Sequence, residues 1–133
     1  MTILFLESFR NSGEQFWVMF TLNVKVCNVE KRKCKVFKLL LDTGATYTVI
    51  NKMKLQALDI KPIDEVKLTL ANGSKVLRKI GIARFHLRGK SAMGFVVFGE
   101  PKDEEVLGIT VLETMGWGFD FKTGKLKSKR VRF

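Results

Sequence analysis

Residues 39–50, with the sequence LLLDTGATYTVI, place one ionisable side chain, Asp42, at the end of a strongly apolar run. An ionised carboxylate is costly to remove from water unless it has partners. Small and hydroxylated residues follow Asp42, and apolar residues then return. Three explanations fit this pattern: a turn residue after a buried strand, a phosphate-binding hairpin, or a catalytic carboxylate.

The spacing Asp-x-Gly-x-Thr-x-Thr from Asp42 to Thr48 is similar to the nucleotide-binding hairpin of actin-like ATPases and sugar kinases. Those proteins enclose a nucleotide between two large lobes, whereas a chain of 133 residues is one domain in size. The phosphate hairpin is therefore the weakest explanation. For an isolated Asp-Thr-Gly, a turn residue stays open, because Asp and Gly are both common in turns.

The third explanation is hydrolysis of a peptide bond by two carboxylates that share one proton. One carboxylate takes a proton from water, and the other, protonated, polarises the carbonyl group. The pKa values then belong to the pair. The chain has one Asp-Thr-Gly, so the second carboxylate must be Asp42 of a second copy, as two-fold symmetry allows. No similar context surrounds the remaining aspartates, Asp59, Asp64, Asp103 and Asp120.

The elements that must position Asp42 are predicted to be mostly β-strands. Apolar runs and alternation predict strands over residues 15–26, 34–41, 65–70, 75–89 and 91–99. Asn72-Gly73 is a strong hairpin-turn signal, and a last hairpin is expected to turn at residues 122–124. These elements favour a small closed or orthogonal β architecture.

Two short helices are predicted beside the strands. Asn51 is a good N-cap for a helix over residues 52–58. Thr110 and Glu113 have the spacing of a capping box for a second helix, which would stop at Gly116. The sequence shows no repeat and no linker, so one domain is expected over residues 1–133, with a core at about 15–121 and a basic C-terminal strand or tail at 122–133.

Three segments together resemble the retropepsins, the single-lobe aspartic proteases of retroviruses and their cellular relatives. LLLDTGATYTVI resembles the family's active-site turn, KLTLANGSKV its flap hairpin, and EVLGITVLETMG its second signature, with Val106, Leu107 and Gly108 in the apolar-apolar-Gly positions. The resemblance covers roughly residues 17–121 and is strongest toward the cellular and archaeal members. It implies a small closed β-barrel of the acid protease type, with one or two short helices, active as a two-fold homodimer.

The resemblance also implies an aspartic endopeptidase and a role for each matching residue. Asp42 would be the catalytic carboxylate. Thr43 would brace the two subunits, Gly44 would allow close backbone approach, and Ala45 would lie beside an extended peptide substrate. No metal or cofactor is implied.

The flap and the support of the active-site loop follow from the other two segments. The flap would fold over the substrate, with its tip at Ala71, Asn72, Gly73 and Ser74. Leu107 and Gly108 would pack behind the active-site loop. The sequence departs from the family pattern in two places. Ile109 stands where a polar or charged residue is usual, and the tip of the flap has a single glycine.

The net charge of +11 predicts attraction to anionic partners. Basic residues gather in the segment KLKSKRVRF, at 125–133, and between Lys31 and Lys35. They serve either as solvated charge that keeps strand edges apart or as an anion-binding surface, including one for nucleic acid through the C-terminus. The alternative function is therefore a catalytically weak or inactive retropepsin-like dimer that acts as a peptide- or nucleic-acid-binding module.

The remaining residues favour ordinary structural roles. Cys27 and Cys34 flank a polar stretch and could face each other across a hairpin. We expect two reduced thiols, with a cross-strand disulfide as the alternative. His86, the only histidine, is expected at a solvated strand position, and Trp17 and Trp117 are expected in the core. No apolar run reaches the roughly 20 residues of a membrane span, and the N-terminus does not read as a secretory signal. We therefore expect a soluble, cytoplasmic protein with no membrane partner.

Overall fold

The computed structural model describes residues 6–9, 15–18, 20–70 and 72–129. Within them it is mostly β, with two short helices, as the sequence predicts. The strands are β1 (Leu6–Phe9), β2 (Gln15–Val18), β3 (Thr21–Cys27), β4 (Cys34–Asp42), β5 (Thr48–Asn51), β6 (Asp64–Thr69), β7 (Lys75–Leu87), β8 (Lys90–Gly99), β9 (Val106–Gly108), β10 (Trp117–Asp120) and β11 (Lys125–Ser128), and the helices are α1 (Lys52–Ala57) and α2 (Ile109–Thr114).

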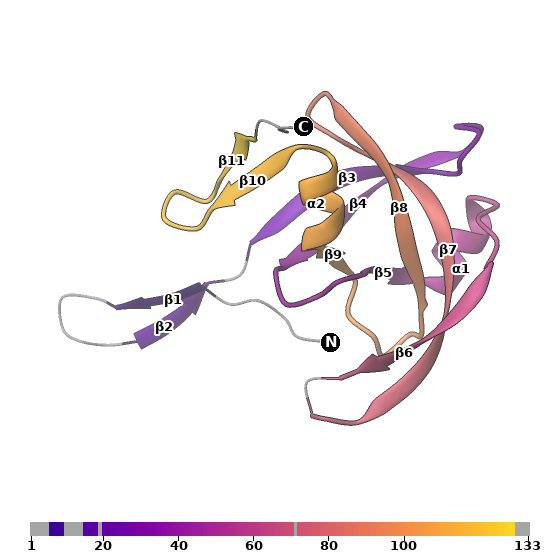
Figure 1. Cartoon of the computed structure of the whole chain (residues 1–133), viewed down its shortest axis with the longest axis horizontal. Helices are drawn as coiled ribbons and strands as arrows, with labels where there is room; N and C mark the ends of the chain where they lie inside the picture. The colour runs from indigo at the N-terminus through magenta and orange to yellow at the C-terminus, as the bar shows by residue number, and fades with distance from the viewer. Residues whose placement is uncertain (1–5, 10–14, 19, 71, 130–133) are drawn as a thin grey trace.

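The main sheet closes on itself as a barrel, which confirms the predicted architecture. Its strands run in the order β3-β4-β9-β5-β8-β7-β6, and a further pairing between β3 and β7 closes six of them into a ring. β6 lies outside the ring as the partner of β7 in a long hairpin (Figure 1). The short strand β9 lies between β4 and β5, parallel to β4.

The barrel core follows from the alternation of apolar residues along its strands. In β3, Leu22, Val24 and Val26 are buried and their neighbours Thr21, Asn23 and Lys25 are exposed. Successive side chains of a strand point to opposite faces, so one face of β3 fills the barrel. Burying such a side chain contributes about 1.5–3 kcal/mol. The largest wholly buried side chain, Phe85 of β7, packs in the same core.

The two helices confirm one predicted start and one predicted stop, and correct one predicted cap. Asn51 caps α1, because its side-chain oxygen accepts a hydrogen bond from the Met53 amide at 2.8 Å. Gly116 has a φ of +87° just after α2, as a stop residue should. The predicted capping box is wrong. Thr110 lies inside α2, which begins directly after β9 with Gly108 at its N-cap and no side-chain cap.

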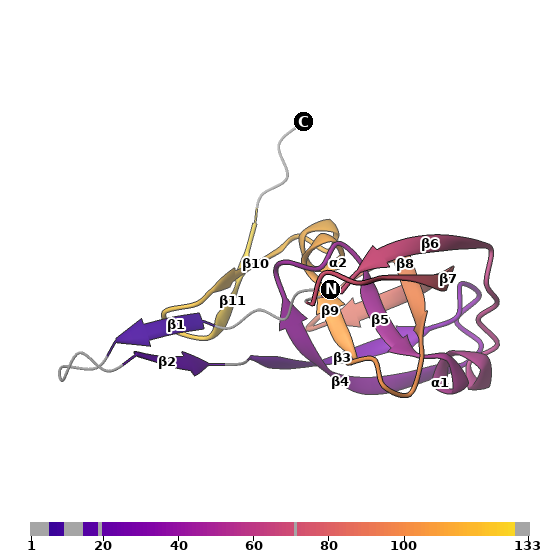
Figure 2. The same ribbon diagram turned by 90° about the horizontal axis from the view of Figure 1, so that it is seen from below.

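Two hairpins extend from one side of the barrel (Figures 1 and 2). One pairs β1 with β2 and the other pairs β10 with β11. The strand predicted over residues 15–26 is therefore divided into β2 and β3. The ring of Phe20, just before β3, lies edge-on against Phe119 of β10, with centroids 4.8 Å apart. Trp117 donates its indole N–H to the Leu87 carbonyl at 3.0 Å and packs against the core, as expected.

Cys27 and Cys34 form a disulfide, so the expectation of reduced thiols is wrong. The register of β3 and β4 places the two residues directly opposite each other at the end of the hairpin. The connecting turn is also held by Asn28, whose side chain accepts the Arg32 amide hydrogen bond at 2.8 Å. The hairpin turn is therefore held by the disulfide and by the hydrogen bond to the Asn28 side chain.

None of the helices in the described residues has the length and apolar character required to cross a membrane. The described residues also contain no group of three or more His, Cys, Asp or Glu side chains that could hold a metal ion.

Candidate active site

Asp42 is the last residue of β4 and lies beside Gly108 in the parallel pairing of β4 with β9. The chain then turns through residues 43–47 and returns as β5, which pairs with the other side of β9. The two strands that flank the turn are therefore held together by β9, which is distant from them in sequence. This arrangement sets the position of Asp42 at the end of β4.

The Asp42 side chain is wholly buried. Its Oδ1 accepts a hydrogen bond from the Gly44 amide at 2.9 Å, and its Oδ2 has no hydrogen-bond partner among the described residues. Burial raises the pKa of Asp42, and the amides of Gly44 and Ala45 oppose this effect only in part. A carboxyl group in this setting holds its proton to higher pH than an exposed aspartate, because burial disfavours the charged form.

The rest of the turn is tied down by its own backbone. The Ala45 amide donates to the Asp42 carbonyl at 3.2 Å, and the Ile109 amide donates to the Ala45 carbonyl at 3.2 Å. Ala45 is buried, Thr43 is half-buried and Gly44 is exposed. Ile109 also packs against the barrel core. The apolar residue that departs from the family pattern thus serves as packing at the start of α2.

Gly108 lies directly against the backbone of the returning segment. Its amide donates to Thr48 Oγ1 at 3.0 Å, and both residues are buried. A Cβ atom at position 108 would lie 2.8 Å from the Tyr47 carbonyl carbon and 3.0 Å from the Thr48 amide nitrogen. Only glycine fits this contact. Leu107, also wholly buried, packs in the barrel core next to it.

A pocket of about 220 Å³ lies between the active-site turn and β6. Ala45, Tyr47 and Val49 line it from the turn, and Leu68 lines it from β6. These residues belong to one apolar cluster that also includes Val97 and Val106. Lys67 of β6 adds a cationic side chain to the lining. The pocket suits an apolar side chain next to an anionic group.

The tip of the β6–β7 hairpin is a compact turn. The Leu70 amide donates to the Ser74 carbonyl at 2.8 Å, and the Gly73 amide donates to the Leu70 carbonyl at 2.9 Å. Asn72 Oδ1 accepts from the Ser74 amide at 2.9 Å and from Ser74 Oγ at 2.6 Å. Gly73 has a φ of +84°, so the single glycine stands where a left-handed conformation is required. Ala71, the fourth predicted tip residue, lies outside the described residues.

An ion pair that the sequence does not predict lies at the base of this hairpin. Arg78 of β7 donates to both carboxylate oxygens of Asp103, at 2.7 and 3.1 Å, and both side chains are about nine-tenths buried. Asp103 also accepts the Glu100 amide hydrogen bond at 2.8 Å. The pair ties the hairpin to the loop that leads into β9. Nothing in the spacing of positions 78 and 103 signals this contact.

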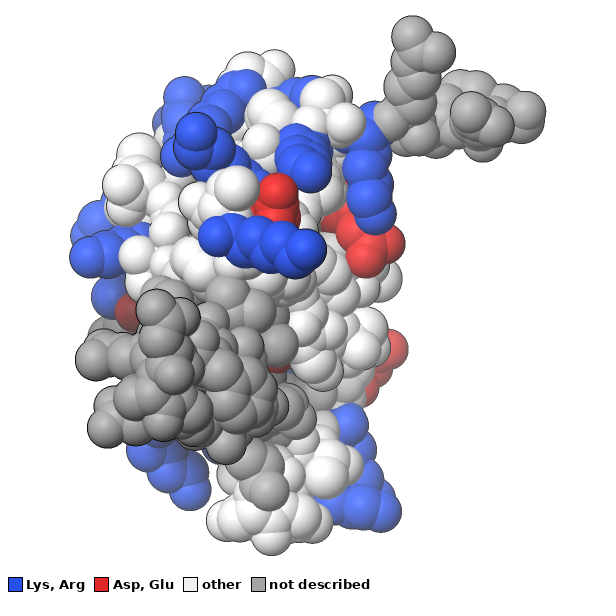
Figure 3. Space-filling view, turned by 90° about the vertical axis from the view of Figure 1, so that its left-hand side faces the viewer, with Lys and Arg blue, Asp and Glu red and all other residues white. Residues whose placement is uncertain are grey.

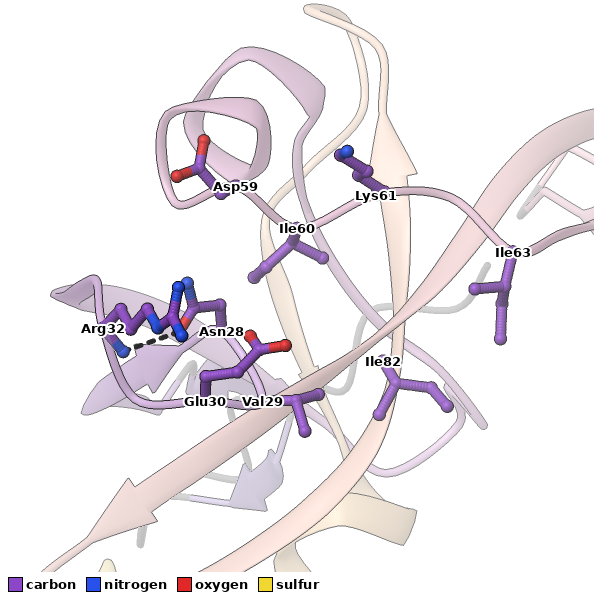
Figure 4. Close-up of a pocket in the computed structure, with 9 residues that line it drawn as sticks. All are labelled: Asn28, Val29, Glu30, Arg32, Asp59, Ile60, Lys61, Ile63 and Ile82. Atoms are coloured by element: carbon purple, nitrogen blue, oxygen red, sulfur yellow. Dashed lines mark hydrogen bonds between the residues drawn. The ribbon is translucent and has the colours of Figure 1, made fainter.

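A larger cavity, of about 580 Å³, lies apart from Asp42 (Figure 4). It is bordered by the turn between β3 and β4 and by the segment 59–63, and Ile60 and Ile82 are among its lining residues. Both signs of charge surround it, because Glu30, Arg32 and Lys61 are among its lining residues. No residue of the active-site turn contributes to it.

Basic side chains outnumber acidic ones on the surface, in keeping with the net charge of +11. Figure 3 shows this on one face, where lysine and arginine side chains are spread widely and acidic ones are few. The site itself is different in character: a buried carboxyl group beside an apolar pocket, with one lysine at its edge.

Comparisons with known proteins found a matching family and a similar solved structure. Residues 23–114 match the model of the family described as "gag-polyprotein putative aspartyl protease". Among solved structures, the chain is similar to a retropepsin-like aspartic protease from Rickettsia conorii, at 22% identity over 90% of this chain and 95% of that chain, with a TM-score of 0.44. Among curated protein sequences no relative was found.

Proposed function

Because the chain belongs to the gag-polyprotein aspartyl protease family, a family of aspartic-type endopeptidases, we propose that it hydrolyses peptide bonds with a water molecule activated by two Asp42 carboxyl groups. The second Asp42 is supplied by an identical chain, because this sequence contains one Asp-Thr-Gly. A two-fold axis that passes beside Asp42 would bring the two carboxyl groups together without any further residue.

The reaction needs one proton shared between the two carboxyl groups. The ionised Asp42 takes a proton from water as the water oxygen forms a bond to the carbonyl carbon of the substrate. The protonated Asp42 gives its proton to the carbonyl oxygen, and a gem-diol forms. The Asp42 that took the water proton then gives it to the amide nitrogen. The other Asp42 takes a proton from a hydroxyl group of the gem-diol as the C–N bond breaks, and an acid and an amine leave. Protons and electrons balance with water as the only co-reactant.

The observation that best supports this proposal is the state of the Asp42 carboxyl group. It is wholly buried, one oxygen is held by the Gly44 amide, and the other has no partner in the described part of the chain. A carboxyl group that serves only as a turn residue would be expected at the surface, because burial of a carboxylate without partners costs free energy. The raised pKa of Asp42 favours a protonated member of a pair.

The pocket beside the turn supports a peptide substrate in extended form. It lies between the active-site turn and β6, so a chain that passes between them meets Ala45 and Tyr47 on one side and Leu68 on the other. Asn72, Gly73 and Ser74 would cover the substrate from the exposed tip of the β6–β7 hairpin. An apolar residue close to the scissile bond is the expected preference.

Cleavage of a mixed peptide library by the wild type, beside the Asp42→Asn variant, tests the proposal, with products identified by mass spectrometry. Asn is nearly the same shape as Asp but cannot ionise. We expect the cleavage rate of the variant to be lower by at least about a thousandfold, because the general acid and the general base are both lost. Equal cleavage by both proteins would reveal a contaminating protease.

The same experiment separates catalysis from simple binding. Wild-type protein that is folded and dimeric but cleaves no peptide at any pH would refute the proposal and favour a peptide-binding module. Asp64→Asn is the matched control, because Asp64 is an exposed aspartate at the start of β6. This control should cleave the library at the wild-type rate.

A further inference from the structure

The outer face of β3 and β7, together with the turn between β3 and β4, carries a group of basic side chains that we call the basic face: Lys25, Lys31, Arg84 and His86. Lys25 lies directly opposite His86 in the pairing of β3 with β7, and Arg84 lies opposite Cys27 on the next rung but one. Residues 84 and 86 point outward, because Phe85 between them is wholly buried in the barrel. Lys31 approaches from the turn between β3 and β4.

The cations of the basic face form no ion pair in the part of the chain that the structure describes. None of the ion pairs found there includes Lys25, Lys31 or Arg84. Arg84 Nε and His86 Nε2 are buried and have no hydrogen-bond partner among the described residues. Burial, followed by the charges of Lys31, Lys25 and Arg84, lowers the pKa of His86. Three cations and a desolvated imidazole therefore lie close together without an ion-pair partner among the described residues.

An apolar strip adjoins the basic face on the same side of the sheet. It consists of Ile82, Met93 and Phe95. The register of β7 with β8 pairs Met93 with Arg84 and Phe95 with Ile82, so these side chains share the outer face. Met93 and Phe95 are 44% and 50% exposed, a large fraction for such residues. A shallow cavity of about 190 Å³ lies among them.

The strip reaches the active-site turn. The ring of Tyr47 lies edge-on against Phe95, with centroids 6.4 Å apart. Tyr47 also lines the pocket between the turn and β6. A continuous path therefore runs from the pocket beside Asp42, over Phe95 and Met93, to Arg84 and its cationic neighbours.

We propose that this path is a docking surface for an acidic, partly apolar segment of the protein substrate. Its apolar side chains would lie on Met93 and Phe95, and its carboxylates would pair with Arg84, Lys25 and Lys31. The guanidinium group of Arg84 is suited to a carboxylate, since it offers donors in a fixed, two-pronged geometry. The inference rests on the proposed function, because it gives that site a substrate class.

The apolar strip favours a peptide over a nucleic acid. A single-stranded nucleic acid is bound by a long track of cations with several aromatic side chains on which bases stack. Here the cations are concentrated at one end. The path offers two aromatic rings, Tyr47 and Phe95, which lie edge-on against each other and do not form a spaced series of stacking surfaces. A segment with apolar residues followed by acidic ones matches that order.

Binding of a labelled peptide to the Asp42→Asn protein tests the proposal without cleavage. The probe is a short fluorescein-labelled peptide with Leu and Phe followed by Glu and Asp, titrated by fluorescence anisotropy. The reference peptide has Gln and Asn in place of the acids. The test variant adds Lys25→Gln and Arg84→Gln. Its matched control adds Lys102→Gln and Lys122→Gln, which remove the same charge from exposed positions elsewhere.

We expect the test variant to raise the Kd of the acidic peptide by about tenfold or more, and the control variant to change it by less than about twofold. Lys25→Glu alone, at an exposed position, repeats the test if the Arg84 change impairs folding. Equal weakening by both variants, or equal Kd values for the acidic and neutral peptides, would overturn the proposal. Tighter binding of a single-stranded oligonucleotide that depends on Lys25 and Arg84 would also overturn it, in favour of nucleic acid.

Cleavage distinguishes a failure of this inference from a failure of the proposed function. Wild-type protein that cleaves the library but shows no preference for substrates with an acidic segment would refute the docking surface alone. Peptide binding at the basic face by a wild-type protein without any cleavage would refute the proteolytic function and leave the surface as a binding site.

Discussion

Gly108 and Thr48 lie in contact across the base of the active-site turn, with the Gly108 amide 3.0 Å from Thr48 Oγ1. The backbone of residues 47 and 48 occupies the space where a side chain at position 108 would begin. The turn that carries Asp42 is therefore supported from behind by a residue 66 positions away in the chain, which the β4–β9 register brings beside it. The position of Asp42 depends on this close contact.

The first prediction follows from that contact. Gly108→Ala should lower the free energy of unfolding by about 1–3 kcal/mol, because the added methyl group meets backbone that cannot rotate away. It should also reduce peptide cleavage by about a hundredfold, because it shifts the turn that carries Asp42. Gly118→Ala is the control, since its added methyl group meets only the flexible side chain of Lys129. Unchanged cleavage by Gly108→Ala would contradict the proposed support.

The second prediction concerns the pH dependence of stability. The raised pKa of Asp42 means that the folded state favours the protonated carboxyl group. Its contribution to stability is therefore complete below the ordinary pKa of aspartate and is lost as pH rises through the raised value. Urea unfolding should show that Asp42→Asn is more stable than the wild type at neutral pH, with the difference shrinking in acid. A difference that grows in acid would contradict the burial of an unpaired carboxyl group.

The third prediction concerns the ion pair at the base of the β6–β7 hairpin. Asp103→Asn should lower the free energy of unfolding by about 3–5 kcal/mol, since it leaves Arg78 buried without its anion. Asp59→Asn is the control. It breaks the exposed pair with Lys33 and should cost less than about 1 kcal/mol. Similar decreases in the free energy of unfolding in the two variants would show that burial does not strengthen the Arg78–Asp103 pair.

The same pair predicts an acid limit of stability. Arg78 holds the pKa of Asp103 below its usual value. The stability that the pair provides is therefore present above the ordinary pKa of aspartate and is lost as pH falls through the lowered one. The difference in the free energy of unfolding between wild type and Asp103→Asn, measured by urea unfolding, should decrease only in strong acid.

The fourth prediction tests the disulfide between Cys27 and Cys34. A cross-link that closes so short a loop should contribute about 2 kcal/mol. Addition of a reductant should destabilise the wild type by that amount and should leave a variant with both cysteines changed to serine unaffected. Detection of two free thiols in the folded wild-type protein, with no effect of reductant, would refute the disulfide.

Much of the fold could be predicted because it depends on local sequence patterns. Alternation in β3, the Asn51 cap and the positive φ at Gly116 each depend on residues that are adjacent in sequence. One error arose where distant segments decide. The capping box at Thr110 and Glu113 does not form, because β9 pairs with β4 and the chain passes directly from β9 into α2. The error at the disulfide has a different cause. The sequence predicts that Cys27 and Cys34 can face each other, and the expectation of reduced thiols rests on a cytoplasmic location.

The candidate site divides in the same way. Asp42 and the glycines around it could be singled out because an isolated carboxylate after an apolar strand is unusual. Tyr47, Lys67 and Leu68 could not, because the pocket they line is formed only when β6 folds over the turn. Arg78 and Asp103 likewise meet only in the closed barrel. Such residues look like ordinary strand and loop residues in the sequence.

The central claim is that one active site takes an Asp42 from each of two chains, and subunit mixing tests it most directly. Wild-type protein is refolded together with a threefold excess of Asp42→Asn protein, and cleavage is measured per wild-type chain. Random pairing should reduce this activity to about a quarter, because only dimers of two wild-type chains hold both carboxyl groups. The Asp64→Asn protein, mixed in the same excess, should cause no loss. Unchanged activity with excess Asp42→Asn would contradict a shared active site.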